Sequence, residues 1–251
     1  KDFKESIFGD KEYEFVLYWN NRNIRRKQPV DVILAFDKFV EALRPEERSK
    51  VCLLMHTNPV EEHGTDLHTT ISHCCSPETN VIFAPNRYTE TELNYLYNIG
   101  DVTINVASNE GFGLATAESV MAGTPIIVTV TGGLQDQCGF RENGTGKLLT
   151  AEDYVEIGSL HDRHKKAGVV WGDWVKPMWP VRSTTGSVPT PYIFDDRIDF
   201  EDITPLIMDF YKMGKEERTK AALKGRKHYL GEGKLSKEAM CDALVEGMEG
   251  A

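Results

Sequence analysis

The stretch from Ser108 to Pro125, SNEGFGLATAESVMAGTP, decides how this chain folds. Before it, residues 102–106 alternate apolar with smaller or polar side chains as a strand does, and residues 114–122 have the pattern of a short helix. Gly123 ends that helix, and Pro125 prevents its continuation. The sequence therefore predicts a strand, a glycine-rich loop and a helix. At such a junction, backbone N–H groups and the positive end of the helix dipole favour phosphorylated ligands.

Strands and helices alternate on both sides of this stretch. Apolar runs rich in aromatic and β-branched residues predict buried parallel strands, and apolar residues at helical spacing predict helices between them. The alternation over residues 13–150 predicts an α/β fold, a doubly wound, Rossmann-like parallel sheet with helices on both faces. We expect the strands at residues 13–19, 51–55, 81–84, 102–106 and 125–130, and the helices at residues 29–43, 90–98 and 114–122.

The rest of the chain is expected to extend the same single domain over residues 1–251. Residues 151–199 have weak periodicity, which predicts an ordered insertion rather than a separate domain. Three tryptophans lie there, at positions 171, 174 and 179. Their faces could stack on sugar rings, but a small aromatic core that pins the insertion is the favoured interpretation. Helical patterns follow over about residues 204–248, at 204–213, 215–229 and 236–248.

Charge and composition restrict the partners. The chain has 251 residues, 40% of them hydrophobic, and a formal net charge of −10. That charge repels nucleic acid, so we expect no nucleic acid partner, and an anionic ligand needs a local basic cluster. Such a cluster follows the first predicted strand and consists of Arg22, Arg25, Arg26 and Lys27. No apolar run reaches the roughly 20 residues needed to cross a bilayer, so no integral membrane segment is expected.

The spacing of cysteines and histidines predicts no metal site. The five cysteines are an odd number without the spacing of metal ligands. Four histidines lie between two predicted strands and match no compact ligand motif: His56, His63, His68 and His73. These features predict a reduced, cytoplasmic protein without a bound metal.

The order of these elements resembles a known family. After the first buried strand come Asn21-Arg22 and, five residues later, Lys27; the segment 110–114, Glu-Gly-Phe-Gly-Leu, is followed by a second glutamate, Glu118. Ala-Gly-Thr-Pro, a strand and Gly-Gly come next. This order is similar to the C-terminal half of retaining glycosyltransferases of the GT-B fold, family 4 or group 1 in particular. The resemblance covers about residues 12–150 and 200–248, and the two glutamates with their intervening glycines are its most specific part.

The resemblance implies roles for four charged residues around a nucleoside-diphosphate sugar. Glu118 would accept hydrogen bonds from both ribose hydroxyls. Glu110 would bind hydroxyls of the transferred sugar. Arg22 and Lys27 would lie on the pyrophosphate, where they replace a divalent metal and stabilise the leaving nucleoside diphosphate. On this hypothesis the protein needs no cofactor.

Two loops would complete the donor site. Gly111 and Gly113 permit a close approach of backbone N–H groups to phosphate, and the N–H groups of Gly113 and Leu114 are the expected donors. Phe112 belongs to the same loop and is expected to anchor it in the core. The resemblance implies that Asn86-Arg87, after the third strand, contacts the nucleobase largely through main chain.

Three details stay open at this point. Gly132 and Gly133 could line the same crevice or form a tight turn. Gln28 stands where the family usually has glycine after the lysine, which leaves the path of this loop undecided. Arg25 and Arg26 make it ambiguous which arginine takes the role assigned to Arg22.

GT-B enzymes consist of two doubly wound domains with the active site between them. The chain resembles only the donor-binding half, so we expect the half that binds a glycan or lipid-linked acceptor to precede Lys1. The fragment alone is then expected to bind donor and to turn over poorly. GDP-mannose and UDP-glucose are both used in the family, and hexosyl transfer from a GDP-sugar is slightly preferred. The alternatives are a non-catalytic nucleotide-sugar-binding or scaffold domain and a GT-B sugar-nucleotide epimerase.

Overall fold

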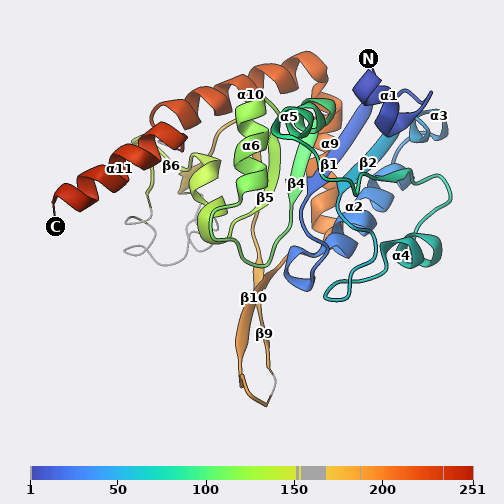
Figure 1. Ribbon diagram of the computed structural model, residues 1–251, viewed down its shortest axis with the longest axis horizontal. Coiled ribbons are helices and arrows are strands. Elements are labelled where there is room, and N and C mark those ends of the chain that lie inside the picture. Colours follow the sequence, from blue (N-terminus) through green and yellow to red (C-terminus); the bar gives the residue numbers. More distant parts are fainter. Residues whose placement is uncertain (1, 151–152, 154–167, 187, 234, 251) are drawn as a thin grey trace.

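The computed structural model describes residues 2–150, 153, 168–186, 188–233 and 235–250. Its central sheet has six parallel strands in the order β3-β2-β1-β4-β5-β8 (Figure 1). The direction in which strands are added reverses between β1 and β4, which makes this the topological switch point of the sheet. The strands are β1 (Phe15–Asn20), β2 (Val51–His56), β3 (Val81–Phe83), β4 (Val102–Asn105), β5 (Ile126–Thr129) and β8 (Val175–Met178).

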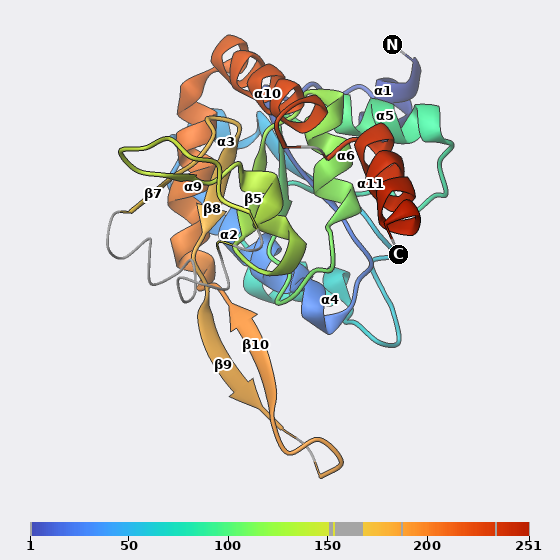
Figure 2. The same cartoon turned by 90° about the vertical axis from the view of Figure 1, so that its left-hand side faces the viewer.

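Helices cover both faces of this sheet (Figures 1 and 2). On one face, α2 (Pro29–Glu41) packs against α9 (Phe200–Met213) and α4 (Leu67–Cys74). On the other, α5 (Glu90–Ile99) packs against α6 (Leu114–Ala122), and α10 (Lys215–Leu230) packs against α6. The remaining elements are α1 (Asp2–Phe8), the 3-10 turn η1 (Arg25–Lys27), α3 (Pro45–Arg48), the 3-10 turns η2 (Gly132–Leu134) and η3 (Asp136–Cys138), β6 (Arg141–Glu142), β7 (Val169–Val170), β9 (Val181–Thr185), β10 (Ile193–Arg197) and α11 (Lys237–Glu249).

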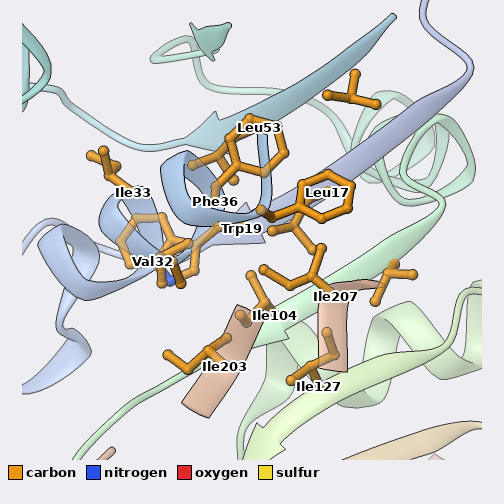
Figure 3. Close-up of a cluster of buried hydrophobic side chains, with 14 of the residues drawn as sticks. Leu17, Trp19, Val32, Ile33, Phe36, Leu53, Ile104, Ile127, Ile203 and Ile207 are labelled. Atoms are coloured by element: carbon orange, nitrogen blue, oxygen red, sulfur yellow. The ribbon is translucent and has the colours of Figure 1, made fainter. Parts of the chain in front are cut away.

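The alternation of side chains along β1 divides the core between the two faces. Leu17 and Trp19 lie in the cluster shared with α2 and α9, which Figure 3 shows around Phe36 and Ile207. Tyr18 points the other way, into the cluster shared with α5. Successive side chains of a strand point to opposite faces, so an uninterrupted apolar run is required where both faces are covered. Each large side chain buried in this way contributes about 1.5–3 kcal/mol.

The predicted α/β fold is confirmed, and every strand and helix predicted between residues 13 and 130 is present. The predicted insertion over residues 151–199 differs from the structure in one respect, because β8 lies within it and joins the main sheet beside β5. Pro177 lies inside this strand, and proline within a short run argues against a strand unless the strand is at an edge, as β8 is. Residues 151–152, 154–167 and 187 lie outside the described part of the chain.

Trp174 belongs to the buried core cluster beside β5 and α10, and Trp171 and Trp179 are partly buried and pack against it. Trp174 is buried and stacks on His228 of α10, with ring centroids 5.1 Å apart. Its indole N–H donates a hydrogen bond to the carbonyl oxygen of Gln137 at 3.2 Å. The packing interpretation of these tryptophans is therefore confirmed. Within the described residues, no helix has the length and apolar character that crossing a membrane requires.

Candidate functional site

The loops that follow β1 and β4 meet at the switch point. Because the strand order reverses there, the connections that follow the two strands run to opposite faces of the sheet. The backbone N–H of Ser108 donates to the carbonyl oxygen of Arg26 at 2.8 Å, which joins the two loops directly. The residues predicted from the glycine-rich stretch therefore lie beside the basic cluster.

Lys27 and Glu110 form the centre of this site. Lys27 ends η1 and is only 6% exposed, and its ammonium group pairs with Glu110 Oε1. Arg26 Nη1 lies 3.2 Å from Glu110 Oε2, and the amide of Asn105, the last residue of β4, donates to Oε1 at 3.4 Å. One partly buried carboxylate, that of Glu110, is thus paired with two cations.

The pKa values of this pair follow from burial and pairing. Burial alone would raise the pKa of Glu110, but hydrogen bonds from Lys27, Arg26 and Asn105 outweigh it and hold the pKa below its usual value. Burial lowers the pKa of Lys27, and the hydrogen bond to Glu110 only partly opposes this. Glu110 is therefore ionised at neutral pH and accepts hydrogen bonds.

Gln28 resolves the path of the basic loop. Its φ of 49° lies in the left-handed region, where glycine is favoured, so the loop takes the course that the family's usual glycine would allow. This backbone conformation costs a non-glycine residue about 1 kcal/mol or more in conformational free energy. The buried side-chain amide of Gln28 offsets this, because it donates to the carbonyl oxygens of Val106 at 3.0 Å and Asp196 at 3.4 Å.

Residues that follow β5 pack against the backbone of the glycine-rich loop and form hydrogen bonds with it. A Cβ atom at Gly132 would collide with the carbonyl oxygen of Glu110, and one at Gly133 with that of Gly111. The buried side chain of Gln137 donates to the carbonyl oxygens of Phe112 and Gly113. Gly132 and Gly133 thus serve the site by allowing close backbone contact, in addition to forming a turn.

The expectation that Phe112 anchors this loop in the core is wrong. Phe112 is 38% exposed, and the loop is held by the hydrogen bond to its carbonyl oxygen instead. Gln137, which donates this hydrogen bond, could not be found from a pattern because it lies 24 residues from Gly113.

Helix α6 begins at the end of this loop. Gly113 has a φ of 87° and precedes the first helical residue, Leu114, which is 68% exposed. The first turn contains no acidic residue. Glu118, one turn further, is exposed and accepts a hydrogen bond from the Tyr97 hydroxyl at 2.6 Å. Asn20, the last residue of β1, donates to the same hydroxyl at 2.8 Å, so Glu118 is oriented from the end of the central strand.

The other predicted residues lie in a neighbouring groove. Arg22, Asn86 and Arg87 line an open cavity of about 480 Å³ at the carboxyl ends of β1, β2 and β3. His56 lies at its side, with Nε2 3.1 Å from the carbonyl oxygen of Asn86, and burial lowers the pKa of this imidazole. Arg22 forms an ion pair with Glu61 on the rim of this groove.

The structure therefore separates the predicted cations. Lys27 pairs with Glu110 and the arginine beside it is Arg26, while Arg22 pairs with Glu61. Gly111 and Gly113 of the glycine-rich loop follow Glu110 closely in the sequence. Asn105 was missed, although a polar residue that ends a buried strand is a recognisable signal. Within residues that the structure describes, no three His, Cys, Asp or Glu side chains are grouped to hold a metal ion.

The fold is the doubly wound, Rossmann-like α/β fold found in GT-B glycosyltransferases. The chain belongs to the family described as glycosyl transferases group 1, whose sequence profile matches residues 1–156. It is 34% identical over 67 residues to a D-inositol 3-phosphate glycosyltransferase of Thermomonospora curvata, which covers 27% of this chain and 15% of that protein.

Solved structures share the fold at low sequence identity. An alpha,alpha-trehalose-phosphate synthase (UDP-forming) from Burkholderia vietnamiensis superposes with a TM-score of 0.62 at 11% identity, over 100% of this chain and 46% of that one. Anabaena Alr3699/HepE in complex with UDP-glucose superposes with a TM-score of 0.56 at 10% identity, over 95% of this chain and 49% of that one. This chain thus spans less than half the length of either structure.

Proposed function

We propose that this chain is the donor-binding half of a retaining, metal-independent glycosyltransferase. The observation that carries the proposal is the meeting of Lys27, Arg26 and Glu110 at the switch point, beside the N-terminus of α6. Cations, loop amides and a helix N-terminus favour a diphosphate, and a carboxylate favours sugar hydroxyls. Together they match the chemistry of a nucleoside-diphosphate hexose.

Lys27 and Arg26 would act on the diphosphate. In the free protein Lys27 and Arg26 both form ion pairs with Glu110. A bound diphosphate would compete for these two cations, and the Glu110 carboxylate would then be free to accept hydrogen bonds from hydroxyls of the sugar. When the bond between sugar C1 and the β-phosphate oxygen breaks, negative charge develops on that oxygen. Preorganised cations stabilise this charge more strongly in a water-poor site than in bulk water. We assign this role to Lys27 and Arg26, in place of a divalent metal.

The nucleoside would extend from this centre in the direction of β3. Glu118 is exposed and oriented by Tyr97, which suits it to accept both ribose hydroxyls. The groove that contains Asn86 and Arg87 has room for a nucleobase, and Arg22 on its rim adds a cation near the nucleotide. The backbone amides of Gly113 and Leu114 would face the phosphates.

The donor that we propose is a UDP- or GDP-hexose. The Anabaena neighbour was solved with UDP-glucose, which supports a UDP-sugar, and GDP-mannose stays the second candidate. We further propose that a part of the protein outside this chain brings a glycan or lipid-linked acceptor to the exposed sugar. The free thiols of Cys52 and Cys138 fit the cytoplasmic location proposed for the enzyme.

A binding panel tests this proposal. Thermal melting is measured with UDP, GDP, UDP-glucose and GDP-mannose, each with and without EDTA; a ligand at 100 times its Kd stabilises the fold by about 2.7 kcal/mol. We expect one nucleotide series to bind, without dependence on EDTA. Glu118→Ala should lose at least about tenfold in affinity, whereas Glu238→Ala, on the exposed helix α11, should not change it.

Three results would contradict the proposal. If none of the four ligands binds, the alternative of a non-catalytic scaffold domain is favoured. Equal binding by Glu118→Ala and the parent would place the ligand elsewhere. Conversion of a UDP-sugar without an acceptor would indicate an epimerase.

A further inference from the structure

The hairpin formed by β9 and β10 projects from the body of the domain (Figures 1 and 2). Its strands pair antiparallel, and Asp195 and Asp196 lie near the end of β10, where the hairpin joins the domain. No sequence pattern indicated a role for these residues. Both residues contact loops of the proposed donor site.

Asp196 contacts three loops that each follow a different strand of the main sheet. Its carboxylate Oδ2 accepts a hydrogen bond from the Thr131 hydroxyl, after β5, at 2.8 Å. Its backbone N–H donates to the carbonyl oxygen of Ser108, after β4, at 3.4 Å. Its carbonyl oxygen accepts from Gln28 Nε2, after β1, at 3.4 Å. A single residue of the hairpin thus joins all three loops.

These loops carry the central pair of the donor site. Gln28 directly follows Lys27, and Ser108 lies two residues before Glu110. The Thr131 hydroxyl also lies 3.5 Å from the carbonyl oxygen of Ser108, so the three loops and Asp196 form one hydrogen-bonded group. Beside it, Asp195 lies 3.5 Å from Arg25 of η1.

We propose that Asp196 is a positioning residue that sets the distance between Lys27 and Glu110 at the diphosphate site. This inference rests on the proposed function for its effect on donor binding, but the positioning itself is a property of the free protein. Asp196 acts through Thr131, Ser108 and Gln28. A binding site of this kind loses affinity when its groups move by about 1 Å, so a fixed loop geometry matters for the donor.

Asp196→Ala and Thr131→Val test this role. Each removes one partner of the 2.8 Å hydrogen bond, and Thr131→Val nearly conserves the shape of the side chain. Two quantities are measured in each variant: hydrogen exchange of backbone amides in residues 24–28 and 106–111, and affinity for the best nucleotide sugar. We expect faster exchange in both segments and about tenfold weaker donor binding.

Three further variants distinguish positioning from general stability. Asp196→Asn keeps an oxygen that accepts from Thr131 and should restore both readouts to near the parent values. The double variant should lose no more affinity than either single variant, because both remove the same bond. Thr184→Ala, an exposed position on the same hairpin, should change neither readout.

Unchanged exchange in both segments of Thr131→Val would overturn the inference, even if Asp196→Ala failed to fold. Additive losses in the double variant would also overturn it. If the parent binds no nucleotide sugar, the proposed function fails, while the exchange of the two segments still decides whether Asp196 positions the loops.

Discussion

Lys27 and Glu110 form an ion pair whose side chains are only 8% and 10% exposed, and this pair connects the loop after β1 to the loop after β4. The residues are 83 positions apart in the chain. Burial of two charges is costly unless each is paired and hydrogen-bonded, and Arg26 and Asn105 supply the additional partners of Glu110. The pair therefore holds the two loops together in the free protein.

The first prediction concerns stability at acid pH. The pKa of Glu110 is lower in the folded state than its ordinary value of 4.5, so its contribution to stability is present above about pH 4.5 and is lost as pH falls through the lowered pKa. We expect the difference in unfolding free energy between the parent and Glu110→Gln to shrink as the pH falls from about 4.5 through the lowered pKa. Urea denaturation across this range measures it, and a pH-independent difference would be evidence against a paired Glu110.

The second prediction concerns Lys27, which we propose binds the diphosphate. Lys27→Met keeps the length of the side chain and removes its charge, so donor affinity should fall by at least about tenfold, the effect of one charge-assisted hydrogen bond. Lys38→Met, at an exposed position of α2, is the matched control and should bind donor as the parent does. Isothermal titration with the best nucleotide sugar measures both. Equal donor affinity of the two variants would show that Lys27 does not bind the donor.

The third prediction concerns Gly132 and Gly133, which lie against the backbone of the glycine-rich loop. Gly132→Ala and Gly133→Ala place a methyl group against backbone carbonyl oxygens, which cannot move without displacing the loop. We expect each to lower the unfolding free energy by about 1–3 kcal/mol and to weaken donor binding. A Cβ at Gly111 meets no atom within 4 Å, so Gly111→Ala should be near neutral for stability. Thermal melting of the three variants checks this order, and an equal effect at all three would contradict it.

The fourth prediction concerns Gln28. Gln28→Gly removes the cost of the left-handed backbone together with the side-chain hydrogen bonds, so its stability should lie within about 1 kcal/mol of the parent. Gln28→Ala keeps the backbone cost and loses the hydrogen bonds, and should be about 1–2 kcal/mol less stable than the parent. Urea denaturation compares the two. A less stable glycine variant would show that the amide contributes more than the backbone conformation costs.

Local sequence patterns were sufficient to predict most strands of the main sheet. The apolar run in β1 and the strand-loop-helix of residues 102–122 have strong periodicity, and both are present as predicted. Strand β8 was not predicted, because four residues that include Pro177 have too little pattern, and only pairing with β5 makes them a strand. Helix α1 was also missed, since its seven residues lie at the start of the chain.

The candidate site was predictable to the level of its loops, but the choice between neighbouring residues was not. Sequence order favoured Arg22 as the partner of Lys27, whereas the turn η1 brings Arg26 to Glu110 and leaves Arg22 with Glu61. Which of several adjacent basic side chains faces a site depends on backbone angles such as those of Gln28. Those angles are in turn fixed by contacts with Val106 and Asp196.

The sequence by itself determined the α/β architecture and the strand-loop-helix that carries Glu110 and Glu118, because periodicity and glycine positions act over a few residues. Only the tertiary structure decided the partners of Glu110, the exposure of Phe112 and the contact of Asp196 with three loops. The physical reason is sequence separation: hydrogen bonds and ion pairs between distant segments leave no periodic pattern, and they form only once the sheet has placed the ends of β1, β4 and β5 side by side.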